Sequence, residues 1–134
     1  MKLQRLTPML WTNDLNATIK FYETYLGFEL DEYNEEWNWC HMHKDEVSLM
    51  FARPNEHTLY NGQPVCTGSF YIYTDEVDEW WESLKDRTTV SYSIANFSHN
   101  MREFAILDNN GYMLQLGREL KEGETVTEWE GNTV

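Results

Sequence analysis

The sequence is poor in basic residues. Its 134 residues include 10 Lys and Arg against 23 Asp and Glu, which gives a formal net charge of −13. Nucleic acids and anionic membrane surfaces are bound through basic patches, so this composition argues against both as partners. The acidic residues either attract a cationic ligand or form ordinary solvated surface, and the charge alone leaves both interpretations open.

Cysteines and long hydrophobic runs are also scarce. Cys40 and Cys66 are the two cysteines, and they do not make a disulfide framework in a chain of this length. No stretch approaches the roughly 18 consecutive apolar residues that mark a membrane-spanning helix. The first six residues, Met-Lys-Leu-Gln-Arg-Leu, lack the apolar segment of a secretory signal. These absences predict a cytoplasmic protein.

Sequence motifs of common catalytic sites are missing. There is no GxSxG elbow, no HExxH pair and no glycine-rich phosphate loop. His41 and His43 are two residues apart on a predicted strand and so share a face, but no acid or cysteine is evidently placed to complete a metal site. With His57 in a predicted linker and His99 near a strand end, we expect four separate histidines.

What the chain does contain is an internal repeat. A strand pattern at 7–14 precedes a helix pattern at 15–22, and the same order recurs at 69–76 and 77–84, 62 residues later. Each copy reads as a short strand, an acidic turn and an amphipathic helix. A period of this length is too long for a solenoid repeat, and only two copies fit. The repeat therefore predicts a duplicated half-domain.

The first copy continues into further strands. Leu15, Ile19, Tyr22 and Leu26 recur at helical spacing, with Asn13 or Asp14 as the cap and Gly27 as the stop. Residues that alternate between the two faces of an extended chain predict the strands, and Lys44-Asp45 fits a tight turn between two of these strands. The predicted strands are 5–12, 28–35, 37–43 and 46–53, and residues 55–67 form the predicted linker.

The second copy has the same order of elements. Strands are predicted at 68–74, 89–96, 102–107 and 112–117, and a helix at 76–86. Its inward residues are Val77, Trp80, Trp81 and Leu84. Asp108-Asn-Asn-Gly111 predicts a hairpin with a primed turn, because Asn-Gly tolerates positive φ angles. The acidic tail 118–134 is expected to be disordered or to lie over a neighbouring subunit.

Together these patterns predict an α+β protein of two tandem βαβββ modules. Their curved mixed sheets would surround a cavity, with the helices on the outer faces. One domain would span residues 1–117, with modules at about 5–54 and 68–117.

Two sets of motifs resemble the vicinal oxygen chelate superfamily, which includes glyoxalase I, extradiol dioxygenases and bleomycin-resistance proteins. The first is Asn13-Asp14-Leu15 with Phe21-Tyr22 and Leu26-Gly27-Phe28; the second runs from Arg102 to Leu116 and includes Asp108-Asn-Asn-Gly111. The resemblance covers about residues 5–117. It implies the fold and a homodimer, and it places Asn100 where relatives often have glycine, a change that asparagine tolerates.

The resemblance also places the family's metal ligands. They match Thr7 and Ser69 on the first strand of each half, and Met50 and Gln115 on the last strand. Metal-dependent members commonly carry His, Gln or Glu there. Since dications prefer imidazole and carboxylate ligands, this set predicts neither a metal nor another cofactor.

An aromatic ligand-binding face is the remaining prediction. Every second residue of a predicted strand lies on the same face of the sheet. The resemblance to bleomycin-resistance proteins places Trp39 where those proteins have an aromatic ring that stacks on the drug. Packing within a core is the alternative for each ring. The predicted ligand-binding residues are Thr7, Met9, Trp11, Trp37, Trp39, His41, Met50, Ser69, Tyr71, Tyr73, Met113 and Gln115.

The sequence thus supports three hypotheses. The first is a metal-independent protein that sequesters an aromatic or cationic small molecule, such as a glycopeptide antibiotic, without a catalytic residue. The second is a metal-dependent lyase, isomerase or dioxygenase of the same superfamily with an atypical site. The third is a structural or regulatory module whose own rings fill the cavity.

Overall fold

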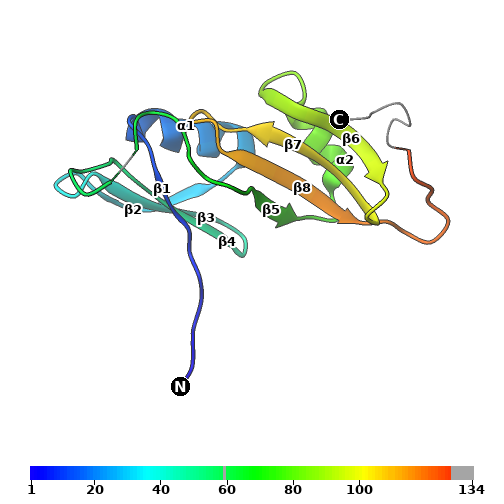
Figure 1. The fold of residues 1–134 in the computed structure, drawn as a ribbon, viewed down its shortest axis with the longest axis horizontal. Coiled ribbons are helices and arrows are strands. Elements are labelled where there is room, and N and C mark those ends of the chain that lie inside the picture. The colour runs from blue at the N-terminus through cyan, green and yellow to red at the C-terminus, as the bar shows by residue number, and fades with distance from the viewer. Residues whose placement is uncertain (59, 128–134) are drawn as a thin grey trace. The chain divides into compact units, whose positions relative to one another are not determined.

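A computed structural model describes residues 1–58 and 60–127 of the chain (Figure 1). The chain divides into two compact units, Met1–Val65 and Cys66–Val134. Each unit has the element order strand, helix and three strands. The predicted α+β class and the two tandem βαβββ modules are therefore confirmed, whereas a cavity shared by the modules stays a prediction.

The first unit is a four-stranded mixed sheet with one helix. The strand order is β1-β4-β3-β2; β1 runs parallel to β4, and the other neighbours are antiparallel. Its elements are β1 (Met9–Trp11), α1 (Leu15–Leu26), β2 (Glu29–Asn34), β3 (Trp39–Lys44) and β4 (Val47–Ala52). The first strand is shorter than the predicted 5–12, and the hairpin turn after β3 is Asp45-Glu46, one residue later than predicted.

Helix α1 has the ends that the sequence predicts. The Asp14 side chain accepts a hydrogen bond from the Ala17 amide, which satisfies one of the free amides of the first turn. Gly27 ends the helix in the left-handed conformation, with φ of 70°. The buried face consists of Leu15, Thr18, Ile19, Tyr22 and Leu26, which confirms the predicted apolar stripe.

The core of the first unit lies between α1 and one face of the sheet (Figure 1). Leu10, Phe51 and Cys40 are neighbours across β1, β4 and β3, and all three are buried. The fully buried Tyr22 of α1 packs its ring 4.8 Å from that of Phe51. Burial raises the pKa of the Cys40 thiol to about 11, so this cysteine stays protonated and unreactive.

The second unit repeats the arrangement with the strand order β5-β8-β7-β6. Strand β5 is parallel to β8, and the other neighbours are antiparallel. Its elements are β5 (Phe70–Tyr73), α2 (Val77–Leu84), β6 (Thr89–Phe97), β7 (Met101–Leu107) and β8 (Met113–Glu119). Asn100, between β6 and β7, has φ of 70°, as its match to a glycine position predicts.

Helix α2 contributes the residues predicted to point inward. Val77 and Leu84 are fully buried, and the Trp81 ring lies 5.2 Å from the ring of Phe104 on β7. Trp80 is half-buried. Asp78 in the first turn accepts hydrogen bonds from Nε and Nη2 of Arg102, which ties the helix to the sheet.

The predicted primed turn before β8 is wrong in its type. Leu107 pairs with Met113, so the loop has five residues instead of two. Gly111 has a positive φ of 98°, whereas the two asparagines before it do not. The Asp108 carboxylate accepts from the amides of Asn110 and Tyr112, and these bonds hold the longer loop.

The segment after β8 is placed by hydrogen bonds within its own unit. Strand β8 continues to Glu119, and residues 120–127 return along the edge strand β6. The Thr127 amide donates to the Asn96 carbonyl, and the Asn96 amide donates to Oγ1 of Thr127. This segment therefore covers part of an exposed sheet edge. The rest of the predicted tail, 128–134, lies outside the described residues.

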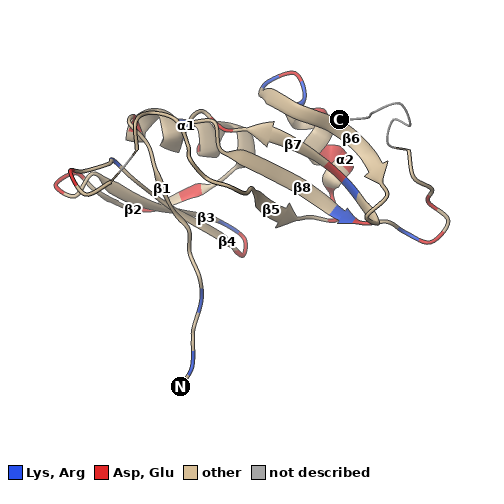
Figure 2. Cartoon of the chain, in the orientation of Figure 1, with Lys and Arg blue, Asp and Glu red and all other residues tan. Residues whose placement is uncertain are grey.

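Acidic residues gather at the turns of the first unit. Figure 2 shows them at the β2–β3 turn, which contains Glu35 and Glu36, and at Asp45-Glu46. Within the described part of the chain, neither helix is both long and apolar enough to cross a membrane.

Candidate ligand-binding faces

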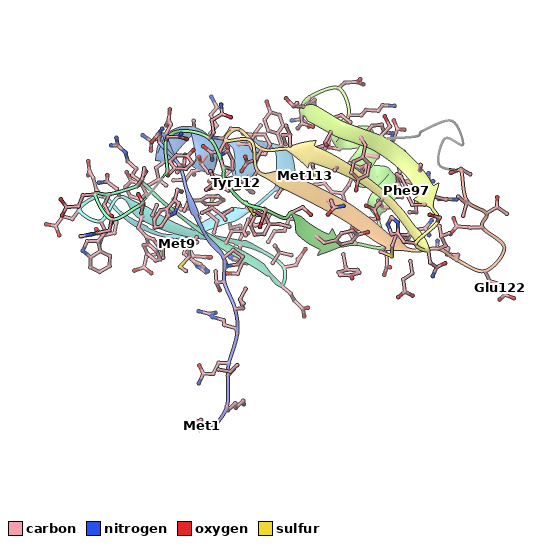
Figure 3. All side chains as sticks on the ribbon, in the orientation of Figure 1. Met1, Met9, Phe97, Tyr112, Met113 and Glu122 are labelled. Atoms are coloured by element: carbon pink, nitrogen blue, oxygen red, sulfur yellow. The ribbon has the colours of Figure 1, made fainter. Side chains whose placement is uncertain are left out.

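The face of the first sheet opposite α1 carries most of the predicted ligand-binding residues of that unit. Met9, Met50 and His41 are neighbours across β1, β4 and β3, and Trp11, Ala52 and Trp39 form the next row. Figure 3 shows Met9 on β1, on the side of the sheet away from α1. The side chains of Trp11, Trp39, His41 and Met50 are half-buried.

Two predicted residues of the first unit lie outside this face. Thr7 precedes β1, and Trp37 lies in the β2–β3 turn with 69% of its surface exposed. Its backbone amide donates to Oδ1 of Asn34. Strand alternation therefore does not place Trp37 beside Trp39, as the predicted strand 37–43 would have done.

The two histidines of β3 share an acidic partner that the sequence does not reveal. Both oxygens of Asp31 on β2 accept from Nδ1 of His43, at 2.7 and 2.8 Å, and Nδ1 of His41 lies 3.0 Å from Oδ2 of the same carboxylate, within ion-pair distance. The pairing of β2 with β3 is irregular between Leu30 and Glu32, which is where Asp31 lies. Because a bulge shifts the register by a residue, spacing alone could not place this carboxylate.

The corresponding face of the second sheet brings together the predicted residues of that unit. Tyr71 pairs with Gln115, and Tyr73 pairs with Gly117. The Ser69 hydroxyl donates to Oε1 of Gln115. Tyr71 and Tyr73 have ring centroids 5.0 Å apart, and Tyr73 is 73% exposed. Met113 lies two residues before Gln115 on β8, so it shares that face; it is labelled at the start of the strand in Figure 3.

A buried carboxylate, missed by the sequence analysis, organises this second face. Glu103 on β7 is 1% exposed, and each of its oxygens accepts two hydrogen bonds. Oε1 accepts from the Tyr71 hydroxyl at 3.2 Å and from Nε2 of His99 at 2.5 Å. Oε2 accepts from the Tyr92 hydroxyl and from Nε2 of Gln115, the latter at 3.1 Å.

The surroundings of Glu103 fix the two tyrosines as donors. Burial raises the pKa of both Tyr71 and Tyr92, and the negative charge of Glu103 raises them further. Both phenols therefore stay protonated at neutral pH. Strand alternation could have found Glu103, because it puts Glu103 on the same face as Ala105, the neighbour of Gln115.

Gly117 provides the space for this cluster. A Cβ atom at position 117 would lie 2.1 Å from the Tyr71 hydroxyl and 2.8 Å from Cβ of Glu103. Beside it, at the ends of β5 and β8, lies a pocket of about 270 Å³ lined by Tyr73, Thr74, Asp75, Gly117, Arg118, Glu119 and Lys121. Pockets for drug-sized ligands have about 300–1,000 Å³, so this one alone is small for such a molecule.

The four positions that the resemblance gives to metal ligands do not fit a dication. The Ser69 hydroxyl is hydrogen-bonded to Gln115, and the Gln115 amide nitrogen donates to Tyr92 and Glu103. Thr7 and Met50 supply neither imidazole nor carboxylate. Across residues 1–58 and 60–127, no group of three or more His, Cys, Asp or Glu side chains could hold a metal ion.

Comparisons with known proteins agree with the architecture. Solved structures with similar folds include TioX from Micromonospora sp. ML1, with a TM-score of 0.71 and 15% identity over 87% of this chain and 100% of that one. A lactoylglutathione lyase from Agrobacterium tumefaciens has a TM-score of 0.67 and 19% identity over 87% of this chain and 95% of the other. A glyoxalase/bleomycin resistance protein/dioxygenase from Nocardioides has a TM-score of 0.68 and 19% identity, covering 95% of this chain and 91% of that one.

At these identities the structures show a shared fold only. A search of curated proteins finds no significant match. Residues 3–116, however, match the family described as the Glyoxalase/Bleomycin resistance protein/Dioxygenase superfamily. With its two βαβββ units and this match over most of its length, the chain belongs to the glyoxalase/bleomycin resistance protein/dioxygenase superfamily.

Proposed function

We propose that this member of the superfamily binds a small aromatic or cationic molecule without a metal and without changing it chemically. The observation that carries the proposal is the hydrogen bond from Ser69 to Gln115. Gln115 is the one plausible metal ligand among the four matched positions, and its amide nitrogen is also engaged, by Tyr92 and Glu103. Both residues at the matched positions of the second unit are thus bound to protein groups.

The side chains around these positions favour binding over chemistry. Glu103 accepts four hydrogen bonds, so its carboxylate is committed to the fold and is poorly placed to act as a base. The half-buried Trp11 and Trp39 in the first unit, and Tyr71 and Tyr73 in the second, offer ring faces instead. Each ring that meets a flat or cationic group contributes about 0.5–2 kcal/mol. The net charge of −13 adds attraction for cations.

The direct test is a titration with metal-free bleomycin, which is cationic and carries flat aromatic rings. Binding is followed by tryptophan fluorescence for the unchanged protein and by calorimetry for variants, because Trp39→Ala also removes a fluorophore. We expect saturation at one drug molecule per chain, and a loss of affinity of about tenfold or more in Trp39→Ala. The control is Trp80→Phe on α2, which should bind as the unchanged protein does.

Measuring metal content separates this proposal from the enzymatic alternative. The protein is purified after growth with added manganese, iron, nickel or zinc, and its metal content is measured. One metal ion per chain that disappears in Gln115→Ala would contradict metal-independent binding and favour a lyase, isomerase or dioxygenase. A flat bleomycin titration, with no metal bound, would exclude this drug and direct a search toward other aromatic cations.

A cytoplasmic location, a homodimeric assembly and a role in antibiotic resistance belong to the same proposal. Each has its own measurement: fractionation of cells, light scattering at several concentrations, and drug survival of bacteria that express the protein. A monomer at all concentrations would contradict the dimer. Unchanged survival would contradict the resistance role but leave ligand binding to be judged by the titration.

A further inference from the structure

Three polar side chains on the first sheet lie in contact in a series that the proposed function does not use. Nδ1 of His41 lies 3.0 Å from Oδ2 of Asp31, and Nε2 of the same ring lies 2.5 Å from Oγ of Ser48. The residues come from adjacent strands: Asp31 from β2, His41 from β3 and Ser48 from β4. The order is carboxylate, imidazole and hydroxyl.

The chemistry of the three groups assigns the proton on the neutral His41 ring and the direction of its hydrogen bond with Ser48. An ionised carboxylate has no proton to give, so the His41 nitrogen that faces it at 3.0 Å, Nδ1, carries the ring proton. In the neutral ring Nε2 then has a lone pair, and it accepts the hydroxyl proton of Ser48. A base that holds a serine hydroxyl and is oriented by a carboxylate is the arrangement that activates a nucleophilic serine.

We propose that Ser48 is a nucleophile toward carboxylic esters, with His41 as its general base and Asp31 as the residue that positions His41. Such sites are recognised by geometry and roles rather than by sequence motifs, so the lack of a GxSxG sequence does not count against it. The proposal does not use the Ser69–Gln115 contact, and its readout, covalent modification of Ser48, is separate from the bleomycin titration that tests ligand sequestration.

The reaction needs no cofactor. As Ser48 Oγ forms a bond to the ester carbonyl carbon, its proton passes to Nε2 of His41. The tetrahedral intermediate collapses, the bond to the alcohol oxygen breaks, and His41 returns the proton to the departing alkoxide. Water, deprotonated by His41, then attacks the acyl carbon. The bond from that carbon to Ser48 Oγ breaks, His41 returns the proton to Oγ, and the carboxylic acid leaves, so that ester and water have become acid and alcohol.

The neighbours of Ser48 indicate the class of ester. His43 lies opposite Ser48 in the β3–β4 register and donates Nδ1–H to Asp31. Met9 and Met50 form an adjacent apolar row, whereas Asp31 and Glu29 put negative charge at the β2 side. Carboxylates at this side repel anionic substrates, so small neutral or cationic esters are the expected class.

The test uses a fluorophosphonate probe, which phosphonylates activated serines with loss of fluoride. The full chain is incubated with the probe, its intact mass is measured, and the modified peptide is identified. We expect one adduct per chain, on Ser48, and a burst of about one nitrophenolate per chain from p-nitrophenyl acetate. Ser48→Ala should lose both signals, whereas Ser91→Ala, which alters an exposed serine of β6, should keep them.

Variants of the other two residues test their roles. His41→Ala should label about 100-fold more slowly, and added imidazole should restore part of the rate only while Ser48 is present. Asp31→Asn should lower the maximal labelling rate without changing the half-saturating probe concentration, because Asp31 orients the base and does not touch the probe. If the folded, unchanged protein gives no adduct on Ser48, or if His41→Ala labels at the same rate, the proposal is wrong.

Discussion

The Ser69 hydroxyl donates a hydrogen bond to Oε1 of Gln115, 46 residues along the chain. Ser69 directly precedes β5, and Gln115 lies on the neighbouring parallel strand β8; both are positions that the family resemblance gives to metal ligands. The Gln115 amide in turn donates to Tyr92 and Glu103. In the second unit these two side chains thus belong to a hydrogen-bonded cluster around one buried carboxylate.

Gln115→Glu should destabilise the protein at neutral pH. The change removes the donor to Oε2 of Glu103, 3.1 Å away, and puts a second negative charge beside a carboxylate that is 1% exposed. Loss of a buried hydrogen-bond partner costs about 1–3 kcal/mol in the free energy of unfolding. Urea unfolding at pH 7 measures this free energy. Gln63→Glu, the same change at an exposed position, is the matched control.

The same pair of variants gives a second check at low pH. A proton on either carboxyl group removes the repulsion in Gln115→Glu, so the difference from the unchanged protein should shrink there. A deficit that is the same at every pH would contradict an electrostatic cause.

Gly117→Ala should be destabilising by overpacking. The added Cβ would lie 2.1 Å from the Tyr71 hydroxyl, and such insertions cost about 1–3 kcal/mol. Gly68→Ala is the control, since nothing lies within 4 Å of its Cβ. Thermal and urea unfolding measure the stability of both variants. Adding Tyr71→Phe to Gly117→Ala should recover part of the lost stability, because it removes the hydroxyl that the new Cβ would meet. Equal stability of the Gly117 and Gly68 variants would show that the strand moves aside freely.

Acid should release the segment 120–127 from β6. Glu124 accepts from Nη1 and Nη2 of Arg118 and from the Lys121 amide, and these bonds lower the pKa of Glu124 to about 2. A carboxyl group whose pKa is lowered by folding stabilises the folded state fully at pH values above its pKa in the unfolded chain. That contribution is lost as the pH falls from 4.5 toward about 2.

Nuclear magnetic resonance of the Thr127 amide measures this release, because that amide donates to the Asn96 carbonyl. Its chemical shift should move toward that of an unstructured residue over this pH range. In Glu124→Gln the transition should disappear and the amide should be released already at neutral pH. A docked Thr127 in that variant would mean that Arg118 and Glu124 do not hold the segment.

Arg102→Lys should loosen α2 from the sheet. Arg102 joins Asp78 through Nε and Nη2, and Asn96 through Nη1 at 2.9 Å. A lysine has one nitrogen and cannot reproduce this planar arrangement, so we expect a loss of about 1 kcal/mol. The guanidinium also lowers the pKa of Asp78, so part of the loss should vanish in acid, as this carboxyl takes up a proton. Lys85→Arg is the control, because it keeps a cation near Glu82.

Local chemistry explains what could be predicted. The cap at Asp14, the left-handed Gly27 and the apolar stripe of α1 each depend on residues within a few positions of one another. The loop before β8 shows the limit of that reasoning. Its Asn-Gly pair indicates a turn, but the Asp108 side chain binds two amides and selects a five-residue loop over a primed turn.

The sequence by itself determined the repeated βαβββ order, the two helices and the family, because hydrophobic periodicity and capping are local. Only the tertiary structure decided which polar groups meet. Glu103 gathers donors from β5, β6 and β8 and from His99, and Asp31 reaches both histidines of β3 across a bulge. Strand order and register create such contacts, and a single change of register would turn each side chain to the other face of its sheet.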